Sequence, residues 1–384
     1  MPAVLYLFAL TNLVIGTGAF VLSGILQPLA TSLEISVAAA GQVMTAYALT
    51  SAFIGPAMLI ATGRWPRKRA LLLALGIFGL GAILTASASS YAVLIAGRVL
   101  MGVGSSFTAM AAAVAVSLVE PERRGRALSL TFIGMSLSYA IGVPFGAWLG
   151  LRFGWQVPVW LVAGGALSMA VVLALLLPSH IESPGASFKG MASVGRQWPV
   201  IRVWTRTLLY FVAIFSVFSY IGPVLLALNP LTPAQLSATL VMFGLSGVVG
   251  TIVGGWSGDR FGPVRTLRAQ LSVLALMMVF VPLTKGWPLL TVLVLMVWGV
   301  AGFGMMSPQQ VLLATHAPQQ APILMSLNGS MLYVGTALGA VISGAAVAGT
   351  GFSRLAWVGL PFALLALATL WFETHRPGES ATPG

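Results

Sequence analysis

One basic residue lies deep inside an apolar segment of the 384-residue chain, and it is the first candidate for chemistry. Arg98 sits about seven residues into the apolar run 91–118, roughly 10 Å below a membrane boundary if each helical residue rises 1.5 Å. A guanidinium is expensive to bury at that depth, so it marks a functional site by default. Arg98 either takes part in a moving or anion-binding contact, or it is satisfied by backbone carbonyls of the first apolar run.

Carboxylates are absent from the middle of the apolar segments. Cysteine is also absent, which excludes disulfides and thiolate metal sites. The segments contain no Ser/His pairing and no paired aspartates, so an intramembrane hydrolase or transferase would lack its catalytic groups. We therefore expect neither an enzyme nor a cofactor, and no buried carboxylate as a proton carrier. The seven acids fall at segment ends, in connections or in the tail: Glu34, Glu120, Glu122, Glu182, Asp259, Glu373 and Glu379.

Glycines spaced by multiples of four form two small-residue faces, because residues four apart share one side of a helix. We expect these faces to pack on each other as a pivot between the halves of the chain; generic small-residue packing is the alternative. Pro144 removes a backbone hydrogen bond within the first face and should kink its helix. The first face contains Gly134, Gly142, Gly146 and Gly150, and the second contains Gly250, Gly254 and Gly258.

The elements that must carry these residues are membrane-spanning helices. Charged residues are 7% of the chain, against roughly 25% in soluble proteins, and apolar residues reach 58%. A spanning helix needs about 20 mainly apolar residues. We predict an all-α polytopic membrane protein with twelve transmembrane helices in two six-helix pseudo-symmetric bundles. The predicted spans are 4–30, 38–61, 70–89, 91–118, 126–150, 156–177, 206–228, 234–257, 266–284, 288–310, 322–348 and 355–372.

A polar stretch divides the chain into an N-terminal bundle (1–177), a cytoplasmic linker (178–205), a C-terminal bundle (206–373) and a cytoplasmic tail (374–384). Residues 194–206 mix tryptophan with arginine, which fits either a short interfacial helix or an irregular tether. Fifteen of the nineteen basic residues fall on one side of the predicted spans and three on the other, leaving Arg98 within a span. This asymmetry places both termini in the cytoplasm. It also explains the net charge of +12 without nucleic acid.

One connection recurs after the second span of each half. It reads Gly63-Arg64-Trp65-Pro66-Arg67-Lys68-Arg69 in the first half and Asp259-Arg260-Phe261-Gly262-Pro263-Val264-Arg265 in the second. The second copy overlaps the glycine-rich motif Gly254-Gly255-Trp256-Ser257-Gly258-Asp259-Arg260-Phe261-Gly262. Two further motifs are Arg98-Val-Leu-Met-Gly102-Val-Gly104 and Gly142-Val143-Pro144-Phe145-Gly146. Together these residues resemble the major facilitator superfamily over nearly the whole chain. Within it the chain is similar to the twelve-span drug:proton antiporter group, and in particular to arabinose-efflux-permease-like exporters.

The resemblance implies roles for several of these residues. Arg98 is expected to contact the first span and to serve coupling. Asp259 is expected to pair with arginines at the cytoplasmic side and to latch that side shut. The first-half connection departs from the family pattern, with Gly63 where the acid is expected and Pro66 where glycine is expected. The full set expected to act in gating is Asp259, Arg260, Gly255, Arg64, Arg67, Gly142, Pro144 and Gly146.

Polar and aromatic residues that interrupt the apolar runs are candidates for a substrate cavity. For any one of them the alternative is a satisfied hydrogen bond between helices. Neutral amides, aromatics and one arginine suit neutral or anionic polar solutes better than lipophilic cations. The candidates are Asn12, Gln27, Tyr139, Tyr220, Trp298, Gln309, Asn328 and Tyr333.

By resemblance, the chain is expected to be a secondary active transporter. It would export small polar or amphiphilic molecules (sugar-, nucleoside- or drug-like) by alternating access, with proton coupling. It is expected to be a monomer in a bacterial-type inner membrane, with a small-molecule substrate, protons and the bilayer as partners and no nucleic acid. Because no carboxylate lies at depth, an uncoupled facilitator or an importer of a neutral or anionic solute is the alternative. A signalling protein on the same fold would be expected to carry a soluble domain, and none is evident in the sequence.

Overall fold

The computed structural model describes residues 2–120, 123–178, 181, 198–316 and 321–371, and within these ranges the regular elements are all helices. The first half comprises α1 (Val4–Phe20), η1 (Val21–Gly24), α2 (Leu26–Ser32), α3 (Val37–Ala61), α4 (Arg67–Ala86), α5 (Tyr91–Gly104), α6 (Ser106–Ser117), α7 (Arg124–Leu137), η3 (Ser138–Gly142), α8 (Val143–Phe153) and α9 (Gln156–Leu176). The second half comprises α11 (Trp198–Phe218), α12 (Ile221–Leu228), α13 (Pro233–Phe261), α14 (Pro263–Phe280), η4 (Val281–Thr284), α15 (Pro288–Gly304), α16 (Met306–His316), α17 (Ala321–Thr350), η6 (Phe352–Arg354) and α18 (Leu355–Ala368).

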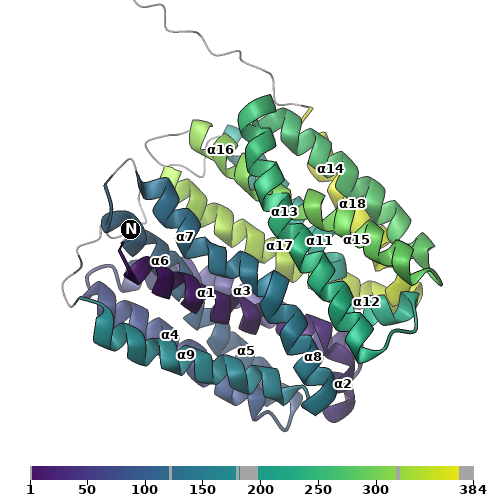
Figure 1. Cartoon of the computed structure of the whole chain (residues 1–384), viewed down its shortest axis with the longest axis horizontal. Helices are drawn as coiled ribbons and strands as arrows, with labels where there is room; N and C mark the ends of the chain where they lie inside the picture. The colour runs from purple at the N-terminus through teal and green to yellow at the C-terminus, as the bar shows by residue number, and fades with distance from the viewer. Residues whose placement is uncertain (1, 121–122, 179–180, 182–197, 317–320, 372–384) are drawn as a thin grey trace, which may run out of the picture.

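The two halves lie side by side, with the first half at the lower left of Figure 1 and the second at the upper right. In the described residues, eleven helical segments are long and apolar enough to cross a membrane, and Phe352–Ala368 is a shorter apolar helix. The predicted fold class is confirmed. The halves meet along two seams: α3 packs on α17, and the run from α7 through η3 to α8 packs on α13.

The helices begin and end where local chemistry allows. The Ser36 hydroxyl accepts a hydrogen bond from the Ala39 N–H and caps α3. Thr232 and Gln235 form a capping box at the start of α13. At the other end of α13 the chain turns at Gly262, which has φ +85° and therefore suits glycine. The expectation of a glycine-rich loop over 254–262 is wrong, because α13 continues to Phe261.

The fifth span is interrupted as its proline predicts. Residues Ser138–Gly142 form a π-helical turn immediately before α8. Pro144 has no N–H to donate to the carbonyl four residues earlier, so the regular α-helical ladder cannot continue through this point. The first span is interrupted as well, since α1 gives way at Phe20 to the 3-10 turn η1.

The seventh span differs most from its predicted bounds. Helix α11 begins at Trp198, so residues 198–205, which the sequence assigned to the linker, are its first two turns. The helix ends at Phe218, and residues 221–228 form the separate helix α12. Most of the predicted linker and the predicted tail lie outside the described residues.

The expectation that the two glycine faces pack on each other is wrong. A side chain at Gly142 would meet Thr17, and one at Gly146 would meet Val21, so the face on the fifth span packs on the first span. A side chain at Gly254 would meet the Gly304 carbonyl of α15, within the second half. The spacing in the sequence shows that one face of a helix carries only small residues, but it does not show which helix packs against that face. Close approaches between the halves occur instead at Gly244 of α13, where a side chain would meet the backbone of Tyr139 and Ala140, and at Gly222 of α12, where one would meet the Gly24 backbone.

Candidate functional site

The ends of the bundle are distinguished by charge. We call the end where α3 meets α4 and α13 meets α14 the basic end, because Arg64, Arg69, Arg260 and Arg265 lie there. The other end, with Arg152, Lys285 and Arg354, is the opposite end. In Figure 1 the basic end is at the upper left, near α16, and the opposite end is at the lower right, near α2 and α12.

Arg98 is fully buried and its guanidinium is directed at backbone oxygens of two neighbouring helices. Nη1 donates to the Gly18 carbonyl and Nη2 to the Ala19 carbonyl, both at 2.7 Å, and Nε donates to the Val43 carbonyl at 3.2 Å. The guanidinium carbon also lies 4.8 Å from the centre of the Tyr47 ring. Arg98 on α5 therefore joins α1 and α3. Its partners on the first span are backbone carbonyls, which is the contact that the resemblance implied and also the alternative stated from the sequence.

The interruption of α1 explains why an arginine is placed there. Gly18 and Ala19 belong to the last turn of α1, where carbonyls lose their regular partners and carry the partial negative charge of the helix dipole. A guanidinium supplies several donors in a fixed plane, which an ammonium does not. The geometry is that of a helix end held by a buried cation.

Asn12 takes part in a polar contact that joins three helices of the first half. Its Nδ2 donates to the Thr131 carbonyl of α7 at 2.9 Å, and its Oδ1 accepts from the Thr108 hydroxyl of α6 at 2.7 Å. Asn12 and Thr131 are fully buried. This is the satisfied hydrogen bond that was the alternative to a cavity role.

The second half repeats this contact between the corresponding helices. The Thr207 hydroxyl of α11 donates to Asn328 Oδ1 of α17 at 2.7 Å. Gln309 of α16 donates from Nε2 to Thr207 Oγ1 at 2.9 Å and to the Val203 carbonyl at 2.7 Å. The first, fourth and fifth spans of each half are thus tied by one buried polar cluster. Asn12 therefore belongs to the cluster of the first half, and Gln309 and Asn328 belong to the equivalent cluster of the second half. The three residues do not line one cavity.

Arg206 is a second fully buried arginine, although the predicted spans place it at a helix end. Arg206 lies in the third turn of α11, donates from Nε to Thr369 Oγ1 at 2.9 Å, and approaches Gln309 Oε1 with Nη1 at 3.4 Å. It was counted as a charge at a span end because the start of α11 was placed eight residues too late. Arg67, expected in a loop, is also buried; it begins α4 and donates to the Gly63 carbonyl at 3.4 Å.

Tyr220 lies at the opposite end and not in a central path. It is fully buried between the end of α11 and α12. Its hydroxyl lies 3.1 Å from the Ala38 carbonyl of α3 and 3.3 Å from the Ala340 carbonyl of α17. Gln42 Nε2 donates to the same hydroxyl at 3.1 Å. Gln27 is at this end too, exposed on α2, so neither residue has the position expected from the sequence.

The centre of the boundary between the halves is aromatic. Tyr139 of η3 stacks on Phe20 of α1, with ring centres 4.8 Å apart. Both rings meet the second half, since Phe20 lies 5.6 Å from Phe215 and Tyr139 lies 4.9 Å from Phe303.

Two further expected residues lie next to this cluster. Trp298 is buried and stacks on Phe243 at 5.0 Å, and its indole N–H has no partner in the described residues. Tyr333 meets Tyr47 edge-on at 6.2 Å, which is a contact between α17 and α3.

The expected latch at the basic end is not formed in this structure. Asp259 is exposed near the end of α13, and in the described residues the ion pair present is Arg123 with Glu120, within one connection. The Arg260 guanidinium lies instead over the rings of Trp256 and Phe261, at 5.6 and 5.8 Å. Arg64 is exposed in the first-half turn, and Gly255 is part of α13.

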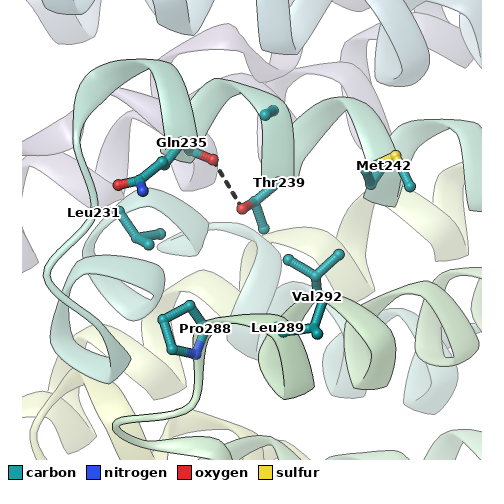
Figure 2. A pocket seen from close by; sticks show the side chains of 8 residues that line it. Leu231, Gln235, Thr239, Met242, Pro288, Leu289 and Val292 are labelled. Carbon is teal, nitrogen blue, oxygen red and sulfur yellow. Dashed lines mark hydrogen bonds between the residues drawn. The ribbon is translucent and has the colours of Figure 1, made fainter.

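A surface groove between α13 and α15 has no features of a solute site. Figure 2 shows Leu231, Gln235, Thr239, Met242, Pro288, Leu289 and Val292 around it. The Thr239 hydroxyl donates to the Gln235 carbonyl of its own helix and is thereby satisfied. The remaining walls are apolar and open outward, as expected for a helix pair that faces lipid.

The fold and its repeated polar clusters define a polytopic helical membrane protein built from two equivalent six-helix halves. The chain belongs to the Major Facilitator Superfamily, a family of transporters, whose family model matches residues 8–322 and 231–384.

Relatives match over nearly their full length. The chain is 30% identical to the inner membrane transport protein YdhP of Escherichia coli K12, covering 95% of this chain and 94% of that one. It is 26% identical to a probable sugar efflux transporter of Mannheimia succiniciproducens, over 95% and 91% of the two chains. Among solved structures, the xylose transporter XylE of E. coli in a partially occluded inward-open conformation matches with a TM-score of 0.76 at 17% identity, over 98% of each chain. That likeness concerns the fold alone.

Proposed function

We propose that this transporter exports small polar or amphiphilic molecules by alternating access, with both termini in the cytoplasm. The observation that carries the proposal is an asymmetry between the two ends. At the opposite end, α3 is hydrogen-bonded to the second half through Gln42 and Tyr220. At the basic end, Asp259 has no ion-pair partner in the described residues. A closed outer side and an unlatched inner side correspond to one state of such a cycle.

The position of Asp259 supports a latch that forms in the other state. A carboxylate in the last turn of a helix faces the negative end of the helix dipole, which costs about 0.3–1 kcal/mol. A partner that arrives only when the basic end closes would offset this cost. Arg124 and Arg126 at the start of α7 are exposed and available for that pairing. Asp259, Arg260, Gly255, Arg64 and Arg67 are accordingly proposed as gating residues.

The chemistry of the boundary supports a ring-bearing, amphiphilic substrate. Rings from both halves meet at its centre, and stacking surfaces of this kind bind flat or ring-shaped molecules. The unpaired indole N–H of Trp298 offers one donor beside them. Relatives named as probable sugar efflux transporters support a hydroxylated ring as the first class of substrate to test.

Proton coupling is part of the proposal, and an uncoupled facilitator is the second candidate. The described acids, Glu34, Glu120 and Asp259, are all exposed, so no carboxylate is buried in the part of the chain that the structure describes. That observation favours the facilitator. In the coupled case, Arg98 is proposed to act through its contact with α1.

Purified protein would be screened by thermal shift against sugars, nucleosides, amino acids and antibiotics, and the best ligand would be followed in vesicles. Accumulation driven by an imposed pH gradient supports a proton-coupled exporter. Equilibration that ignores the gradient supports the facilitator. A chain that moves no ligand in either direction, while still binding it, would refute the proposed transport.

A further inference from the structure

One tyrosine from the second half takes part in closing the opposite end. Tyr220 follows the last turn of α11, and its hydroxyl is placed between carbonyls of α3 and α17. Gln42 of α3 adds two contacts, donating to the Tyr220 hydroxyl at 3.1 Å and to the Ala340 carbonyl at 3.3 Å. Three of these four contacts join the first half to the second.

Two glycines make the space that the tyrosine fills. A side chain added at Gly41 on α3 would overlap the Tyr220 ring. One added at Gly344 on α17 would come within 2.5 Å of Gln42 Nε2 and 2.6 Å of the Tyr220 hydroxyl. Both seam helices therefore lack a side chain at the level of the ring, and the fit is specific to this arrangement of the halves.

Gln42 itself is held in register for this contact. Its Oε1 accepts a hydrogen bond from the Thr45 hydroxyl at 2.8 Å, which leaves the amide nitrogen directed at the second half. All the partners are neutral, so the contact does not depend on salt or on a titrating group. These hydrogen bonds form only over a short donor–acceptor distance, so they break when α3 and the second half separate by a few ångströms.

We propose that Gln42 and Tyr220 are the outer gate of this transporter, and that Tyr220 positions the two halves and does not contact substrate. The inference rests on the proposed alternating access. The hydrogen bonds between α3 and the second half stabilise the state with the opposite end closed, and all three break each time that end opens. Weakening them shifts the population toward the outward-open state without changing the substrate site.

The test uses the absence of cysteine in the wild-type chain. Cysteines introduced as S32C and R354C, at exposed positions on opposite halves, carry spin labels whose separation is measured by double electron–electron resonance. Tyr220→Phe removes only the hydroxyl, and Gln42→Met keeps the side-chain size without the donors. Each is expected to raise the long-distance population about three- to eighteenfold, the ratio that corresponds to losing a hydrogen bond between membrane helices. The matched controls, Tyr6→Phe and Gln27→Met, are exposed residues expected to leave it unchanged.

The outcomes separate this inference from the proposed function. If Tyr220→Phe and Gln42→Met leave the distance distribution as in the wild type, the gate is refuted even if transport is normal. A lowered melting temperature with unchanged distances also refutes it, because that is the result of a merely structural role. If the distances shift as expected while the unmutated chain moves no solute, the gate stands and the proposed export fails. Weaker substrate binding by Tyr220→Phe with unchanged spin-label distances would refute the gate and show that Tyr220 contacts substrate.

Discussion

Replacing Arg98 by alanine removes the cation that holds the end of α1. Three backbone carbonyls then lose their partners, those of Gly18, Ala19 and Val43. Hydrogen bonds between membrane helices contribute about 0.6 kcal/mol on average and up to about 1.7. The three contacts therefore stabilise the fold by about 2–5 kcal/mol, and the cation–π contact with Tyr47 adds about 0.5–2 kcal/mol.

The loss is measured as the change in unfolding free energy in a denaturing-detergent titration of purified protein. Arg98→Lys is expected to lose about half as much as Arg98→Ala, because an ammonium keeps the charge but cannot reach all three carbonyls. Arg152→Ala is the matched control, since Arg152 is exposed and faces Trp148 and Phe153 at the opposite end. An Arg98→Ala protein as stable as the Arg152→Ala control would refute the assignment.

The same variant tests the proposed role of Arg98 in coupling. We expect Arg98→Ala to abolish export against a gradient while downhill exchange survives, because its donors face the protein backbone and not the aromatic centre. Loss of exchange together with loss of substrate binding would mean that Arg98 holds an anionic substrate. Export against a gradient at the wild-type rate would contradict both roles.

Three further predictions concern packing, gating and the polar clusters. Gly146→Leu should lower the unfolding free energy by about 1–3 kcal/mol in the denaturing-detergent titration, because Val21 of η1 occupies the space. Gly164→Leu should leave it unchanged, since nothing lies within 4 Å of a side chain there. Asp259→Asn should slow transport severalfold with an unchanged substrate Kd; a weaker Kd at a normal rate would contradict the latch. Gln309→Leu should lower the unfolding free energy by about 1–3 kcal/mol, because buried polar groups lose their hydrogen-bond partner. Gln310→Leu, at the exposed neighbouring position, should change it by no more than about 0.5 kcal/mol. Equal losses in the two variants would show that the cluster does not stabilise the fold.

The fold was predictable because lipid imposes strict requirements on sequence. Backbone groups in the bilayer must be satisfied within the helix, so each span appears as a long apolar run. Arg98 was predictable for the same reason, since one charge within such a run is conspicuous. An irregularity at Pro144 was expected as a kink because of the missing N–H, but its form as a π-helical turn over Ser138–Gly142 was not predicted.

The partners of individual side chains were not predictable from spacing. The glycine face that contains Gly142 was expected against the eighth span but packs on the first, because any helix can use a small-residue face. Arg206 was missed because α11 begins at Trp198, and a shift of two turns moves a residue from the helix end to the interior. Tyr220 looked like a cavity residue because a tyrosine in an apolar run has the same appearance whether its hydroxyl meets a solute or a carbonyl.

The long sequence separation of the contacts to α1 has a consequence for synthesis of the chain. Asn12 is hydrogen-bonded to Thr131, which lies 119 residues further along the chain. The carbonyls at the end of α1 are hydrogen-bonded to Arg98, which lies about 80 residues further along. At about 5–20 residues per second, Asn12 is without its partner for roughly 6–24 s. During that interval the Asn12 amide nitrogen lacks the Thr131 carbonyl, and for the first part of it the end of α1 also lacks Arg98. Both raise the free energy of α1 in lipid. We therefore expect α1 to reach its final packing only after the fifth span has emerged, so the first helix to be made is among the last of its half to pack fully.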